Sequence, residues 1–306
     1  MKFLKNNDLI LRLKGIIKGQ RIVHAYLFYG EDFVLIREIA KFFAKEILCV
    51  GDGEFCKSCS SCKKFLSGNH PDFYEIGQKD QKGQSFTVSD VREMIKKAYI
   101  KPNESTYKIF LLNDVDSLLK SSLNALLKIL ESPPKYVVFI LTASNKNSVL
   151  KTVFSRCVDF FVPVCSREDC VKYVEEKKFK TKGRNMEEIL DLSAGRLDLL
   201  EQYLTLKEAE DAMSISRELL DSFLKGEEFR FIFTLQKLEN KLLFLFFVFS
   251  SFLARVQIYL KELKDFEFEK VEKLYMVVDA FQDTIKNLKN NANMSLSLSS
   301  LCCRIF

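Results

Sequence analysis

The chain has 306 residues, of which 47% are hydrophobic and 29% are charged, a composition typical of a soluble globular protein with two or three domains. The formal net charge of +6 is too small an excess to indicate nucleic-acid binding by itself. The most apolar stretch, residues 242–254, is shorter than the roughly 20 residues that a membrane span needs, which excludes a spanning segment and predicts a buried helix.

The N-terminal residues 1–14 lack the apolar core of a signal peptide. The sequence contains nine cysteines. Without a secretion signal, this number indicates a reducing compartment, where clustered thiols bind metal more often than they form disulfides. A cytoplasmic protein is therefore expected.

The first half of the chain alternates strand and helix patterns. In chain order these are a strand at 25–29, a helix at 34–48, a strand at 108–112, a helix at 117–131, and strands at 137–142 and 160–164. Pro133 and Pro134 end the second helix, because proline cannot continue a helix. This alternation predicts an α/β domain, residues 1–165, with a parallel sheet covered on both faces.

After Pro163 the patterns are helical only. Ser166 is a candidate N-cap, with acidic residues in the helical turn that follows it. A break near Leu206 divides a small helical domain, 166–207, from a larger one, 208–306. Within the larger domain, residues 229–260 carry phenylalanines around the whole helix circumference. A helix buried on all sides is expected there, either in a bundle core or against other subunits.

Four cysteines lie close together: Cys49, Cys56, Cys59 and Cys62. Their pattern is C-x6-C-x2-C-x2-C, and zinc prefers four thiolates at such spacing. The alternative is that they are ordinary buried cysteines. Loop-forming neighbours such as Gly51 and Ser58 speak against it. The spacing predicts a zinc module over residues 49–62 that is structural, since no ligand position is left open; the other five cysteines lack metal spacing and are expected to be packing residues.

Strand 25–29 is followed by Gly30 and a helix, which is where an ATPase carries its phosphate-binding loop. That loop has the pattern G-x4-G-K-[ST], in which amides cradle the phosphates, lysine neutralises them and the hydroxyl holds magnesium. Counted from Gly30, the last three positions are Leu35, Ile36 and Arg37. None of them can do this work, so no bound ATP is expected.

The residues after strand 108–112 are also altered. An ATPase carries Asp-Glu there, to hold magnesium and to orient water, whereas this chain has Asn113 and Asp114. Asparagine has no charge to offer a metal, and aspartate is one methylene short for the base. Two independent losses predict that the chain has no ATPase activity of its own.

Several segments together carry a family resemblance. They are His24 to Phe28, the cysteine module followed by His70 to Phe73, Val88 to Asp116, Asn124 to Pro134, and Ser155 to Cys157. In these segments the chain resembles the delta-prime subunits of the bacterial DNA polymerase III clamp loader, within the AAA+ superfamily of ATPases. The resemblance covers most of residues 20–165, and the helical remainder matches in length and layout only.

The resemblance implies an AAA+ nucleotide-fold domain with a zinc module, a helical lid domain and a C-terminal helical collar that holds a ring of five subunits. The partners it implies are gamma or tau ATPase subunits and the delta subunit, with the sliding clamp and primed DNA reached through the complex, and no membrane. Gamma and tau subunits share the cysteine module and the Ser-Arg-Cys motif. The degenerate phosphate loop therefore favours delta-prime.

The resemblance also implies a role for Arg156, because the arginine of Ser-Arg-Cys projects into the ATP site of a neighbouring subunit. Guanidinium suits this because it stays charged and offers a fixed fork of donors to phosphate. The alternative is that Arg156 is a solvated charge at the start of a strand.

Lys128 and Glu131, three positions apart on one helix, could pair with each other. The nucleotide-sensing arginine of gamma-like lids aligns ambiguously here, at Leu197 or nearby, and Arg196 is not assigned that role.

Three hypotheses follow. The first is a non-hydrolysing stator that supplies Arg156 in trans during clamp loading on primed DNA. The second is an ATP-hydrolysing gamma/tau-type subunit with an unorthodox loop. The third is a stand-alone zinc-dependent DNA-binding protein, against which the modest net charge speaks.

Overall fold

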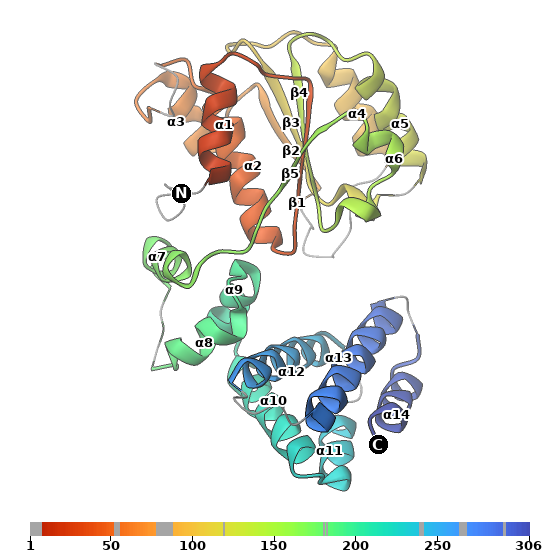
Figure 1. The fold of residues 1–306 in the computed structure, drawn as a ribbon. Helices are drawn as coiled ribbons and strands as arrows, with labels where there is room; N and C mark the ends of the chain where they lie inside the picture. Colours follow the sequence, from red (N-terminus) through yellow and green to blue (C-terminus); the bar gives the residue numbers. More distant parts are fainter. Residues whose placement is uncertain are drawn as a thin grey trace. The chain divides into compact units, whose positions relative to one another are not determined.

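The computed structural model describes residues 8–51, 56–77, 88–118, 120–179, 181, 183–238, 242–262, 268–289 and 292–306. These residues form two compact units (Figure 1). The first unit contains the chain up to Lys177 together with Arg196–Asp198, and the second contains Lys178–Gly195 and the chain from Leu199 onward. Part of the expected zinc module, residues 52–55, lies outside the described residues.

A parallel five-stranded sheet lies at the centre of the first unit, in the order β2-β3-β4-β1-β5. The strands are β1 (Ala25–Tyr29), β2 (Phe73–Ile76), β3 (Lys108–Leu112), β4 (Val137–Ala143) and β5 (Val158–Phe161). Leu27 of β1 lies opposite Leu141 of β4, and Tyr26 lies opposite Val158 of β5. The predicted parallel sheet is thus confirmed, with β1 in its interior.

Helices cover both faces of this sheet (Figure 1). One face carries α1 (Asp8–Lys18), α2 (Phe33–Leu48) and α3 (Ser60–Leu66), and the other carries α4 (Val88–Ala98), α5 (Lys120–Glu131) and α6 (Lys151–Phe154). Short 3-10 helices η1 (Val115–Ser117) and η2 (Lys146–Ser148) and the helix α7 (Arg167–Lys177) complete the unit. As predicted, Ser166 caps α7, since its hydroxyl accepts the Asp169 N–H at 3.2 Å.

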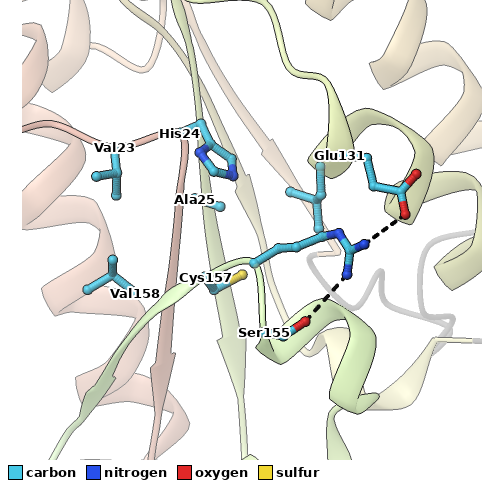
Figure 2. Close-up of a pocket in the computed structure, with 9 residues that line it drawn as sticks. Val23, His24, Ala25, Glu131, Ser155, Cys157 and Val158 are labelled. Carbon is cyan, nitrogen blue, oxygen red and sulfur yellow. Dashed lines mark hydrogen bonds and ion pairs between the residues drawn. The ribbon is translucent and has the colours of Figure 1, made fainter.

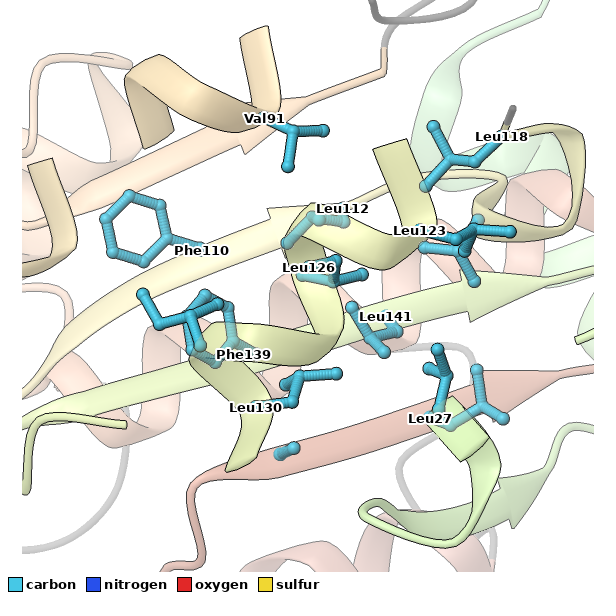
Figure 3. Packing of buried hydrophobic residues seen from close by; sticks show 14 of the residues in the cluster. Leu27, Val91, Phe110, Leu112, Leu118, Leu123, Leu126, Leu130, Phe139 and Leu141 are labelled. Atoms are coloured by element: carbon cyan, nitrogen blue, oxygen red, sulfur yellow. The ribbon is translucent and has the colours of Figure 1, made fainter. Parts of the chain in front are cut away.

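The side chains of β1 alternate between two buried layers, as a strand's two-residue period requires. Leu27 packs with Phe110, Leu126 and Leu141 in the layer beneath α4 and α5 (Figure 3). On the other face the Tyr26 ring meets Phe43 of α2 edge-on, at 4.7 Å between centroids. Because β1 is buried on both faces, the position of the loop that follows it is fixed by the core.

The second unit consists of helices, with no strand among its described residues. They are α8 (Met186–Ser193), α9 (Leu197–Thr205, whose first two residues belong to the first unit), α10 (Ala209–Leu224), α11 (Glu228–Gln236), α12 (Leu242–Glu262), α13 (Phe268–Lys289) and α14 (Met294–Ile305). The Arg255 guanidinium contacts the Glu188 carboxylate and the Ser216 hydroxyl, so one polar cluster joins α12, α8 and α10. The division into lid and collar at 207/208 remains a prediction.

The apolar helix α12 has 21 residues, more than the sequence suggested. Within the described residues one segment, Phe244–Glu262, is long and apolar enough to cross a membrane by length and composition, so the prediction that the apolar stretch is too short to span a membrane was wrong. Its packing supports a core helix instead. Arg255 lies within it, with 13% of its side chain exposed, and pairs with Glu188 of the same unit.

Two other sequence expectations need correction. Strand β5 begins at Val158 rather than at 160 and ends at Phe161 rather than at 164, and the Val162 N–H that follows it donates to the Tyr29 carbonyl at 2.8 Å. The segment 229–260 contains two helices rather than one continuous helix, α11 and α12. Phe229 and Phe233 of α11 are 91% and 59% exposed, so this part is not buried on all sides.

The backbone just after β5 passes close to Gly30. A Cβ atom on Gly30 would clash with the Val162 carbonyl oxygen. We therefore expect Gly30→Ala to destabilise the chain by about 1–3 kcal/mol, the usual cost of overpacking. Gly15 in α1 has nothing within 4 Å of its Cβ position, so Gly15→Ala is the matched control and should stabilise by about 0.5–1 kcal/mol. Urea unfolding measures both, and equal behaviour of the two variants would contradict this explanation.

Candidate functional site

The segment after β1 is short and leads directly into a helix. Gly30, Glu31 and Asp32 separate Tyr29 from Phe33, the first residue of α2. The positions at which a phosphate loop would wrap its ligand are thus already helical. Asp32 is the N-cap of α2, and its carboxylate accepts the Leu35 N–H at 3.0 Å. Amide groups that would face phosphates in an ATPase face the chain's own carboxylate instead.

The Asp32 carboxylate also contacts a segment far along the chain. Its second oxygen accepts the Leu197 N–H, and the Asp198 N–H is a further donor. Asp32 is 1% exposed. Burial, followed by the nearby Asp198 charge, raises the pKa of Asp32 to about 6, although these N–H donors act in the opposite direction.

Leu35, Ile36 and Arg37, at the three positions that bind triphosphate in an ATPase, make other contacts in this chain. Leu35 and Ile36 are each 1% exposed and belong to the core. The Arg37 Nε donates to the Glu75 Oε1 at 2.6 Å, and Lys41 reaches the other oxygen of Glu75 at 2.8 Å. Burial alone would raise the pKa of Glu75, but these two cations outweigh it and hold that pKa below its usual value. The charges near the missing loop are thus paired within the chain.

Asn113, at one of the altered acidic positions, contacts Glu75, the carboxylate that also binds Arg37 and Lys41. The Asn113 side-chain amide donates to Glu75 at 3.1 Å. Asp114 has φ of 53°, a left-handed conformation, and its N–H donates to the Thr142 hydroxyl at 3.1 Å. Thr142 therefore holds the turn after β3. Neither Glu75 nor Asp32 was predicted from the sequence, although an aspartate just before a helical pattern, such as Asp32, is an N-cap signal.

The four predicted cysteine ligands lie together. All four sulfurs are within 4.8 Å of one another, and the Cys49–Cys56, Cys56–Cys62 and Cys49–Cys62 distances are 3.8, 3.8 and 3.5 Å. A tetrahedron with Zn–S bonds of about 2.3 Å has S–S edges of about 3.8 Å, so the sulfurs fit zinc. The backbone N–H groups of Cys59 and Cys62 also point at sulfurs, each at 3.4 Å.

His70 connects this cysteine cluster to the sheet. The Asp72 N–H donates to His70 Nδ1 at 3.1 Å, which places the ring proton on Nε2. Nε2 then donates to the Ser61 hydroxyl at 2.8 Å, and Ser61 donates to the Leu48 carbonyl at 2.6 Å. Burial lowers the pKa of His70, which favours this neutral form. These contacts give His70 a structural role, as the link between the cysteine cluster and the sheet.

Arg156 lies at the opposite edge of the sheet from Gly30, because it precedes β5 while Gly30 follows its parallel neighbour β1. The length of β1, five residues, separates the two edges by about 16 Å. Arg156 donates to the Glu131 carboxylate at 2.9 Å and to the Thr152 carbonyl at 2.8 Å. Glu131 thus pairs with Arg156, a partner that the sequence did not suggest.

Arg156 and Glu131 border an open pocket of about 680 Å³ (Figure 2). Its lining includes the apolar side chains of Val23, Leu130 and Val158. His24 lies at the pocket, and its Nε2 atom has no partner among the described residues. The Arg156 side chain is 33% exposed here. At the other edge of the sheet, the Arg196 guanidinium donates two hydrogen bonds to the Asp198 carboxylate, from Nε at 3.0 Å and from Nη2 at 2.7 Å. The positive charge of Arg196 thus neutralises that carboxylate.

Comparison with known proteins gives a consistent set of relatives. Residues 5–164 match the family model described as DNA polymerase III, delta subunit. The chain is 36% identical over 154 residues to DNA polymerase III subunit tau/gamma of Haemophilus influenzae, covering 50% of this chain and 22% of the relative. It is 32% identical over 146 residues to DNA polymerase III subunit delta' of Bacillus subtilis, covering 47% of this chain and 44% of the relative. The matched part spans less than half the length of either.

One solved structure has a similar fold over nearly the whole chain. It is a DNA polymerase III gamma subunit-related protein from Thermotoga maritima, with a TM-score of 0.53 and 20% identity, covering 97% of this chain and 98% of that one. The similarity therefore extends to the helical second unit.

We expect one zinc ion per chain, held by the four cysteines. Cys59→Ser should lower the zinc content and the unfolding temperature, because a structural site contributes its binding energy to folding. Cys303→Ser, at an exposed cysteine outside the cluster, is the control and should change neither. Metal analysis with thermal unfolding tests this, and wild-type protein without zinc would contradict the assignment.

Two buried carboxylates should give opposite pH dependences. The folded chain raises the pKa of Asp32 from 3.8 to about 6, so it binds the Asp32 proton more tightly than the unfolded chain does, and stability falls as pH rises through that window. This rise corresponds to about 3 kcal/mol, which Asp32→Asn should remove from the pH profile.

Asp72 is the matched comparison. Burial acts to raise its pKa, but N–H bonds from Asn103, Glu104 and Ser105 outweigh burial and hold the pKa below 3.8. Asp72 therefore stabilises the fold above pH 3.8, and this contribution is lost as pH falls below that value. Urea midpoints of wild type, Asp32→Asn and Asp72→Asn, measured from about pH 2 to pH 7.5 so that both windows are covered, test both signs, and parallel profiles of all three would contradict them.

Proposed function

The chain belongs to the DNA polymerase III delta-subunit family of clamp-loader proteins, and from that membership we propose that it is a delta-prime-type subunit. It takes part in loading the sliding clamp onto primed DNA without binding or hydrolysing ATP itself. Its partners are the gamma or tau ATPase subunits and the delta subunit, and this replication role implies a cytoplasmic location.

One observation carries the proposal that this subunit binds no ATP. The N-terminus of α2, which would receive the phosphates, is capped by the Asp32 carboxylate. A triphosphate would have to displace a buried anion and enter beside the apolar side chains of Leu35 and Ile36. The loss of amide donors, of the lysine and of the metal-binding hydroxyl would each weaken binding. The pairing of Arg37 with Glu75 removes one further cation.

The position of Arg156 supports a role in trans. It lies at the edge of the sheet opposite the degenerate loop, about 16 Å away along β1, and this separation from the chain's own loop supports service to a site on another subunit. Its guanidinium is at the surface and is held by the exposed carboxylate of Glu131. An exposed ion pair of this kind contributes only about 0–1 kcal/mol, so phosphate on a neighbour could replace it at small cost.

The remaining modules have supporting roles in this proposal. Zinc, bound by the four cysteines, holds the loop between α2 and α3 and takes no part in chemistry. His70 anchors that loop to the sheet through Ser61. The helical second unit acts as the lid and the collar through which the subunits of the ring associate, and the chain as a whole acts as a stator for the ATPases.

A second candidate function is an ATP-hydrolysing gamma/tau-type subunit. The similarity to tau/gamma of Haemophilus influenzae favours it. Leu35, Ile36 and Arg37 at the phosphate-binding positions oppose it. A stand-alone zinc-dependent DNA-binding protein is a weaker third candidate, opposed by the net charge of only +6.

The proposed finger is tested in a loader reconstituted with the partner subunits, the clamp and primed DNA. Arg156→Ala should lower the stimulated ATP turnover by about 10³-fold at the site it serves, if trans arginines act here as they do in GTPases. The overall loss will be smaller, since other ATP sites in the ring remain. Thr152 offers only its backbone to Arg156, so Thr152→Ala is the neighbouring control.

Glu131→Gln separates the finger from the ion pair that holds it. This variant should keep nearly full turnover, because the exposed Glu131–Arg156 pair contributes little energy. Unchanged turnover in Arg156→Ala would remove the proposed role. Equal losses in Arg156→Ala and Glu131→Gln would instead indicate that the pair only maintains the local fold.

A further inference from the structure

One buried carboxylate serves two helices. Asp32 accepts the Leu35 N–H in the first turn of α2 through one oxygen and the Leu197 N–H at the start of α9 through the other, and the Asp198 N–H is a further donor to this carboxylate. An ordinary N-cap satisfies donors of its own helix only. Here the second helix begins 165 positions later in the chain.

The charges of this arrangement balance. Each helix N-terminus carries roughly half a positive charge, so two of them together match the single negative charge of one carboxylate. The nearby guanidinium of Arg196 is engaged by Asp198 through two bonds of 3.0 and 2.7 Å. The amide groups of the two helices are therefore the main partners of Asp32, as they would be for a bound oxyanion.

We propose that Asp32 is a built-in anion that joins the start of α9 to the start of α2, in the place where a bound phosphate group would make the same kind of contact. The segment Arg196–Asp198 belongs to the first compact unit, although the chain on both sides of it belongs to the second. Asp32 is the carboxylate that holds this segment there. The connection is therefore present without nucleotide.

This inference does not depend on the clamp-loader role, because it concerns a contact within the chain. It also gives Asp32 a purpose beyond excluding ATP. A subunit whose two helix starts are joined by its own side chain has no need of a ligand to join them, which is the behaviour expected of a stator.

The full-length chain with Asp32→Ala tests the proposal. Hydrogen exchange of peptides covering residues 33–36 and 196–199 should become about tenfold faster in both, since each loses a buried hydrogen-bond acceptor. Sodium formate, a small carboxylate, should slow exchange in both peptides again in a saturable manner, and sodium chloride at equal ionic strength should not.

Asn185 provides the matched control. It caps α8 through the N–H groups of Glu187 and Glu188 and serves that helix only. Asn185→Ala should speed exchange at the start of α8, without effect on residues 33–36 or 196–199 and without rescue by formate.

Asp32→Ser decides the matter even if Asp32→Ala fails to fold. Serine can cap α2 but has one oxygen, too few for both helices, so residues 33–36 should stay protected while 196–199 exchange faster. Protection of 196–199 equal to wild type in Asp32→Ser would overturn the proposal. So would an Asp32→Ala chain whose exchange responds to formate and chloride alike.

Discussion

The hydrogen bond from the Leu35 N–H to the Asp32 carboxylate is the contact on which the candidate site depends. It begins α2 at Phe33, so the residues that would form a phosphate loop are wound into a helix. Once they are helical, Leu35 and Ile36 point into the core, and the charge of Arg37 is satisfied by Glu75. The altered sequence therefore folds into a stable alternative structure. In it the carboxylates of Asp32 and Glu75 make contacts with the amide and cationic groups that a bound phosphate would otherwise contact.

The opposite edge of the same sheet carries Arg156, the residue proposed to act on a neighbouring subunit. Parallel strands place Gly30 at the carboxyl edge and Arg156 at the amino edge, so a change at one edge leaves the other intact. The cysteine cluster is also independent of the missing loop, since His70 and Ser61 connect it to β2 and to the end of α2. In the proposed function, the altered phosphate-binding positions and the residues proposed to act on other subunits are therefore structurally separate.

Much of the first unit could be predicted from the sequence, because its signals are local. Apolar runs gave β1 and β3 with their observed ends, and the spacing of four cysteines gave a cluster whose sulfurs fit zinc. The short, amphipathic β2 has no such run, so it was missed. The pairing of Asp32 with Leu197, and of Glu131 with Arg156, joins residues far apart in the chain, and no local pattern reports such contacts. The exposure of Phe229 depends on where α11 ends, which composition does not define.

The central claim is that the Asp32 carboxylate leaves no site for ATP at the start of α2. Calorimetric titration of the isolated full-length chain with ATP and magnesium tests it most directly. If an internal carboxylate fills the start of α2, no saturable binding should occur up to millimolar nucleotide, and the unfolding temperature should not rise with added ATP. Saturable binding with micromolar affinity would show that the triphosphate still finds amide donors beside Gly30, and the account given for Asp32 would be wrong.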